Sequence, residues 1–137
     1  MSDSPTAPDR TRPTDRDDLP AVFADLAFIL LFSIIGRSTH GESMEIYEVA
    51  RTALPFWVGA LIGHVIIRFM RRSPRTLGWG AFIVVATWTL GQAGRFLLQL
   101  TSEPTFLAVS AAFLTLFLLG WRVVLILVVR LRRRSRR

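Results

Sequence analysis

Cysteine and lysine are both absent from this chain of 137 residues. The absence of cysteine excludes disulfide bonds, thiol catalysis and cysteine metal sites. The absence of lysine makes every strongly basic side chain an arginine, a preference that a GC-rich genome explains without any role for the protein. Extended polar stretches are few, since 51% of the residues are hydrophobic and they cluster in blocks. Such blocks indicate membrane spans rather than a soluble core.

Recognisable catalytic motifs are absent as well. The sequence has no G-x-S-x-G nucleophile motif, no P-loop and no paired-aspartate motif of lipid phosphotransferases. The two histidines, His40 and His64, fall in opposite halves of the expected membrane, so they cannot be the two axial ligands of one haem. We therefore expect no enzymatic activity, no cofactor and no bound metal ion.

Four apolar segments predict an all-α fold. Each has about 18 residues or more, which is enough for a helix to cross a hydrocarbon core of roughly 30 Å, although the first is marginal. Backbone groups in lipid must pair within their own segment, which requires helices. The predicted spans are residues 19–36, 53–70, 77–100 and 105–129. We expect one transmembrane domain over residues 19–129, folded as an integral membrane four-helix bundle.

Proline and charge mark the expected ends of these segments. Pro55 is placed to open the second helix. Residues 1–18 are polar with nothing to bury, and they predict a disordered cytoplasmic tail. Residues 130–137 predict a second, basic cytoplasmic tail.

The arginines are concentrated at alternate connections between the spans. They precede the first span, lie between the second and third, and follow the fourth, whereas the first expected loop has two and the third has none. The positive-inside rule therefore places both termini in the cytoplasm. The basic tail then lies against anionic lipid headgroups of the bilayer, and we expect no nucleic-acid partner for it.

Three ionisable residues within the spans predict an inner charge cluster. Counted from the cytoplasmic span ends at about 1.5 Å per residue, Asp25, His64 and Arg122 lie at about the same depth. Because an unpaired charge there is costly, we predict an Asp25–Arg122 ion pair with His64 nearby. The pair either holds the bundle together or serves a proton relay or substrate site, and the sequence leaves both open. Arg68 is close enough to a span end to reach the surface.

A second set of polar residues predicts an outer polar cap at the opposite span ends. Its members are Arg37, His40, Glu42 and Arg95. Such a cap could bind an anion, a metal or a partner, and a plain connector with solvated charges explains the same residues. The metal signal is weak, because no histidine-rich or H-E-x-x-H spacing supports it.

Gly59 and Gly63 form a small-xxx-small pair in the second span. This spacing allows two helices to approach closely. The contact it predicts lies either within the bundle or between two copies of the chain, as a means of self-association.

Three stretches resemble a known family. They are "FADLAFILLFSIIGRSTHGES", "TALPFWVGALIGH" and "LFLLGWR". Their most specific elements are Gly36-Arg37 with His40 and Glu42, Pro55-Phe56, and Gly120-Trp121-Arg122. Over about residues 22–124 the chain resembles the domain of unknown function 3054 family of small bacterial membrane proteins. The resemblance implies a four-span protein, here placed in the bacterial cytoplasmic membrane, and implies nothing about activity.

Two functions from different classes fit these observations. The first is a non-enzymatic membrane module that binds a partner or supports an assembly. The alternative is a small oligomeric transporter or permeability protein that uses the interior charges as a pathway. Interior water or a continuous polar path would favour transport, whereas a sealed bundle with an outer cap would favour the module. A membrane enzyme is a third class, which the lack of a catalytic constellation disfavours.

Overall fold

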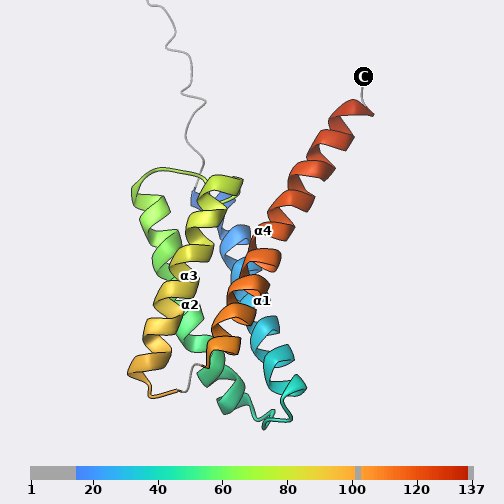
Figure 1. Cartoon of the computed structure of the whole chain (residues 1–137). Coiled ribbons are helices and arrows are strands. Elements are labelled where there is room, and N and C mark those ends of the chain that lie inside the picture. Colours follow the sequence, from blue (N-terminus) through green and yellow to red (C-terminus); the bar gives the residue numbers. More distant parts are fainter. Residues whose placement is uncertain (1–14, 101–102, 136–137) are drawn as a thin grey trace, which may run out of the picture.

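Four α-helices and no strand make up the part of the chain that the computed structural model describes, residues 15–100 and 103–135. The helices are α1 (Asp15–Thr39), α2 (Ile46–Phe69), α3 (Leu77–Leu97) and α4 (Pro104–Arg134). Consecutive helices run in opposite directions, so the start of α1, the α2–α3 turn and the end of α4 lie on the same side (Figure 1). We call this side the inner end, and the side of the α1–α2 loop the outer end. The predicted all-α fold of four helices is confirmed.

Three of the described helices, α1, α2 and α4, are long and apolar enough to cross a membrane. The helix α3 is not among them, because glycine, threonine and glutamine dilute its apolar residues. Gly80 and Gly91 of α3 are buried against side chains of α4 and α2. These contacts cover one side of α3, while Val85 on another side is 59% exposed. A membrane span for residues 77–100 stays a prediction.

The helix α2 starts earlier than the sequence predicted and continues through a proline. It begins at Ile46, and Pro55 lies inside it, so the prediction that Pro55 opens this helix is wrong. Proline has no N–H group, which removes one backbone hydrogen bond from the helix interior. Close packing offsets this loss, because a Cβ atom added to Gly94 of α3 would lie 3.0 Å from the Pro55 ring. A glycine on the facing helix thus accommodates the proline.

The two predicted tails are partly helical. The helix α1 begins at Asp15, so the end of the predicted tail of residues 1–18 belongs to its first turn, and residues 1–14 lie outside the described part. The helix α4 has 31 residues and continues to Arg134, which makes most of residues 130–137 helical. Its last part projects beyond the other three helices at the inner end (Figure 1). Residues 136–137 lie outside the described part.

Aromatic rings fill the core between the helices. The centroid of the Phe32 ring lies 5.5 Å from that of Phe56, 6.1 Å from that of Phe106 and 5.2 Å from that of Phe113. Gly91 leaves room for one of these rings, since a Cβ atom there would lie 2.3 Å from Phe56 Cδ1. Below this aromatic layer the buried core continues toward the inner end with aliphatic side chains, namely Ile29, Ile67, Ile83, Leu114 and Leu118.

The glycine pair of α2 packs against α3 within the same chain. A Cβ atom added to Gly59 would lie 3.0 Å from the carbonyl oxygen of Thr87, and one added to Gly63 would lie 3.3 Å from the Cβ atom of Ala86. Of the two contacts that the spacing allowed, the structure therefore shows the one inside the bundle. A second copy could reach these glycines only if α3 moved away from α2.

Candidate functional site

Helical periodicity directs Asp25 into the bundle. Ala21, Asp25 and Ile29 follow one another at intervals of four residues on one face of α1, and all three are at most 1% exposed. The apolar members of this face pack in the core, so the carboxylate between them is carried inward with them. A carboxylate in this position needs a partner, because an unpaired charge within a membrane costs at least a few kcal/mol.

Arg122 of α4 supplies that partner. It ends a buried stripe that also contains Ser110, Leu114 and Leu118, and its side chain is fully buried. The guanidinium donates from Nη1 to Asp25 Oδ1 at 2.8 Å and from Nη2 to Asp25 Oδ2 at 2.7 Å. Two parallel bonds of this kind fix the orientation of both groups as well as their distance. The predicted ion pair is thus a direct contact in the structure.

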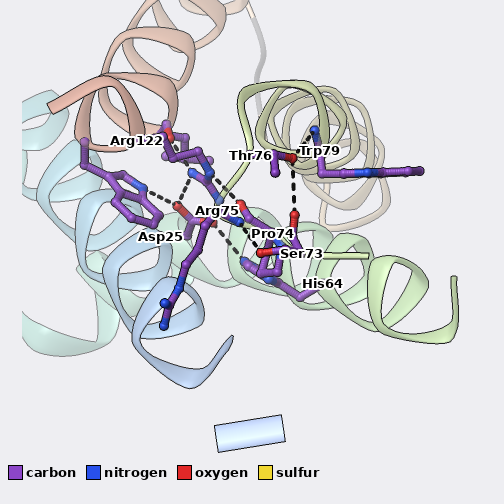
Figure 2. Close-up of polar contacts among 10 residues, drawn as sticks. Asp25, His64, Ser73, Pro74, Arg75, Thr76, Trp79 and Arg122 are labelled. Carbon is purple, nitrogen blue, oxygen red and sulfur yellow. Dashed lines mark hydrogen bonds and ion pairs between the residues drawn. The ribbon is translucent and has the colours of Figure 1, made fainter. Parts of the chain in front are cut away.

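The remaining donors of Arg122 bind to backbone carbonyl oxygens. Its Nε atom donates to Pro74 in the α2–α3 turn at 2.8 Å, and Nη1 also contacts the carbonyl of Leu118. Gly80 of α3 makes space for the side chain, because a Cβ atom there would lie 2.5 Å from Arg122 Cδ. Figure 2 shows the guanidinium held between the carboxylate and the turn.

Two further side chains bind to the same carboxylate. The indole Nε1 of Trp121 donates to Asp25 Oδ1 at 2.8 Å, and the Trp121 ring lies 4.4 Å from the guanidinium carbon of Arg122. His64 of α2 contacts Asp25 Oδ2 through Nε2 at 2.8 Å (Figure 2). We call Asp25, His64, Trp121 and Arg122 the inner cluster. It joins α1, α2 and α4 directly, and the carbonyl of Pro74 adds the α2–α3 turn.

Sequence reasoning placed three members of the inner cluster together and missed the other contacts. Trp121 was recognisable only as a neighbour of Arg122 in the Gly-Trp-Arg motif, since a tryptophan near a span end usually lies at the membrane interface. The carbonyl of Pro74 gives no signal at all, because every residue has one. Gly80 had no distinguishing signal among nine glycines.

Arg37 organises the outer end of the bundle. It lies in the last turn of α1, and its Nη1 atom is 2.9 Å from Glu42 Oε2. The same side chain donates from Nε to the carbonyl of Ser43 at 2.8 Å and from Nη1 to the hydroxyl of Thr52 at 3.2 Å. These bonds fold the α1–α2 loop back over the helix ends. Glu48 is a looser partner at 3.8 Å.

The other two residues of the predicted outer polar cap behave differently from each other. Arg95 of α3 is buried, its guanidinium carbon lies 4.0 Å from the centroid of the Phe106 ring, and the charge of Glu42 acts on it favourably. His40 is exposed, and its Nδ1 atom lies 2.8 Å from the carbonyl oxygen of Gly36. The imidazole therefore binds to the end of its own helix. Arg37, Glu42 and Arg95 form the cap, with His40 at its edge.

Neither cluster has the composition of a metal site. Among the described residues, no group of three or more histidine, cysteine, aspartate or glutamate side chains is placed to hold a metal ion. The inner cluster has a single carboxylate whose two oxygens already bind to Arg122, Trp121 and His64. Its chemistry is that of a charge-balanced hydrogen-bond network.

Comparison with known proteins identifies a family and nothing more specific. Residues 22–125 match the family described as "Protein of unknown function (DUF3054)". The match covers most of the chain and includes both the inner cluster and the outer cap. No curated protein and no solved structure matches the chain.

Proposed function

Because this chain belongs to the DUF3054 family, whose description assigns no activity, we propose a function from the geometry of its two polar clusters. The chain is a sealed membrane module that binds a partner at its outer end. It neither conducts a solute nor catalyses a reaction. The observation that carries the proposal is the aromatic layer that separates the outer cap from the inner cluster.

The aromatic layer interrupts any polar path along the bundle axis. Arg95 lies against the ring of Phe106, and the rings of Phe32, Phe56 and Phe113 continue from there across the core. Of the buried hydroxyl groups in this region, that of Ser33 binds to the carbonyl of Ile29 on its own helix, and that of Ser110 accepts hydrogen bonds from Gln92 and Trp88 of α3. We infer that these local bonds do not join the outer cap to the inner cluster. A transporter or a permeability protein would need a connected path.

The outer end has the features of a contact surface. Arg37 binds to Glu42 and Ser43 of the α1–α2 loop, and Ile46 and Tyr47 beside this loop are 89% and 70% exposed. Exposed apolar patches rimmed by polar residues mark surfaces that bind another protein or a membrane, and we take the first as the proposal. Glu45 directly precedes these two residues in the chain and is exposed, which favours a partner with basic groups.

The position in the membrane is part of the proposal. We place α3 across the bilayer as a fourth span, since it packs between α2 and α4, and we place the inner end in the bacterial cytoplasm. The arginine distribution supports this orientation. Arg130, Arg132, Arg133 and Arg134 at the end of α4 then meet anionic lipid headgroups of the inner leaflet.

Reconstitution into sealed vesicles tests whether the bundle conducts. The protein is inserted into vesicles that contain a pH-sensitive dye, and a proton or potassium gradient is applied. We expect the gradient to decay at the rate of protein-free vesicles, with an added ionophore as the positive control. A faster decay that is lost in the Asp25→Asn, Arg122→Gln double variant would establish the transport function instead.

Site-specific cross-linking tests the partner at the outer end. A photoactivatable residue replaces Tyr47, and a matched one replaces Val85, which is 59% exposed on α3. We expect a single protein adduct of defined mass from the first position and only lipid adducts from the second. Arg37→Gln should reduce that adduct, because the loop then loses its anchor. Equal adducts at both positions would contradict a binding surface at the outer end.

A further inference from the structure

A groove runs between α1 and α2 at the inner end of the bundle. It has a volume of about 170 Å³. Its walls are mostly apolar and come from both helices, with Leu19 and Val22 on α1 and Leu61 and Val65 on α2. Its ionisable lining residues are Asp18 on α1 and His64 and Arg68 on α2.

His64 presents an unused polar atom at this groove. Its side chain is 7% exposed, and its Nε2 atom is occupied by Asp25. Within the described residues, the Nδ1 atom has no hydrogen-bond partner. Among the described residues, Thr87 Oγ1 is the only side-chain polar atom that is both fully buried and unpaired, so the Nδ1 atom of His64 remains accessible to a ligand or to solvent. In a neutral ring Nδ1 accepts a bond from a hydroxyl group, and in a doubly protonated ring it donates one to an oxygen.

Arg68 stands one helical turn beyond His64 toward the rim. Residues four apart share one face of a helix, so both side chains border the same groove. Arg68 already has other interactions in the structure. Its guanidinium carries five N–H groups in all, and these can donate hydrogen bonds to more than one partner. In the part of the chain that the structure describes, Arg68 is the one arginine that lines the groove, and Asp18 is its one acidic lining residue. Arg71 follows at the same end of the bundle, whereas Arg72 lies over the Trp79 ring of α3.

We propose that the groove binds one anionic phospholipid of the adjoining leaflet. The phosphate lies at Arg68, the glycerol and ester region lies at the Nδ1 atom of His64, and one acyl chain follows the apolar walls. Basic pockets between membrane helices bind anionic headgroups in this way. The site differs from the basic end of α4, which lies on another helix. It rests on the proposed membrane position and adds a lipid that contacts the inner cluster.

Lipid titration of purified protein tests the site. Phosphatidylglycerol and phosphatidylcholine are added separately to the protein in mild detergent, and bound lipid is counted by native mass spectrometry. Val65→Trp fills the groove, and its control is Ile66→Trp, which alters the neighbouring exposed residue outside the groove. Arg68→Gln removes the headgroup contact, and its control is Arg71→Gln. Thermal unfolding confirms that each variant is folded.

We expect the wild type to retain one phosphatidylglycerol at concentrations where phosphatidylcholine is not retained. Val65→Trp and Arg68→Gln should each weaken retention about tenfold, which corresponds to about 1.4 kcal/mol, while both controls stay at the wild-type level. Equal retention of the two lipids, or equal retention by Val65→Trp and Ile66→Trp, would overturn the proposal. Alkaline extraction of membranes tests the membrane position separately, so the two failures are distinguishable.

Discussion

At the scale of single residues, Asp25 and Arg122 determine the character of the inner cluster. Both side chains are fully buried, so each depends on the other for charge compensation. Removal of one partner from a buried pair typically costs roughly 3–5 kcal/mol, whereas removal of both costs less. The pair is therefore strongly coupled, and a double-mutant cycle isolates the coupling from the effect of each substitution.

Asp25→Asn and Arg122→Gln should each lower the stability of the folded protein in detergent by about 3–5 kcal/mol. Each variant leaves one charge buried without its partner, while the double variant leaves none. We expect the double variant to recover part of the loss, as measured by thermal unfolding and by folded yield. Arg130→Gln is the control for a change of charge at an exposed position. Two single losses that simply add would disprove the coupling.

The depth of these charges was predictable from the sequence, whereas their full set of partners was not. Counting residues from the span ends placed Asp25, His64 and Arg122 at one level, because the rise per residue of a helix is constant. The rotation of each side chain about its helix axis depends on packing with the other helices. For that reason the contact of Trp121 with the carboxylate, and the turn of His40 toward its own helix end, became visible only in the structure.

At the scale of helices, the contact between α2 and α3 depends on small residues. Gly59 and Gly63 let the backbone of α3 approach, and Gly91 and Gly94 receive Phe56 and Pro55 in return. Glycines on both helices therefore make the surfaces complementary. In a membrane, where the hydrophobic effect does not drive helices together, such close packing is a principal source of association.

Gly59→Leu should destabilise the folded monomer, since its side chain would meet the backbone of α3 at Thr87. Forcing a larger side chain into a packed contact typically costs about 1–3 kcal/mol. Gly120→Leu is the matched control, because a Cβ atom at Gly120 has no neighbour within 4 Å. Thermal unfolding of both variants in detergent provides the comparison. Unchanged stability together with a loss of self-association would instead place Gly59 between copies of the chain.

Helix type and number followed from the sequence, but the helix ends did not. Apolar blocks of membrane length require helices, since no other element satisfies its own backbone in lipid. No equally strong rule tells whether the polar residues just before or just after such a block are helical. Residues 46–52 therefore read as a loop, although they form the first turns of α2, and the arginines after residue 129 extend α4. Both extensions lie beyond the apolar segments from which the spans were drawn.

At the scale of the whole molecule, the arginines predict the orientation in the membrane. Their concentration at the inner end favours cytoplasmic termini. Reporters that are active only in the cytoplasm should work when fused at either terminus or after Arg72. A periplasmic reporter should work when inserted in the α1–α2 loop, for example after Gly41. Activity of a periplasmic reporter after Arg137 would reverse the assignment.

The inner cluster also imposes an order on the synthesis of the protein. Its carboxylate is made with the first helix, whereas its arginine is 97 residues further along and belongs to the last. A ribosome therefore completes three helices while Asp25 still has no permanent counter-charge. His64 is synthesised much earlier than Arg122, and its imidazole can form a hydrogen bond with the Asp25 carboxylate until α4 is made. The bundle is closed only when α4 arrives, so a chain cut short before Arg122 leaves the Asp25 carboxylate without the arginine that compensates its charge in the finished protein.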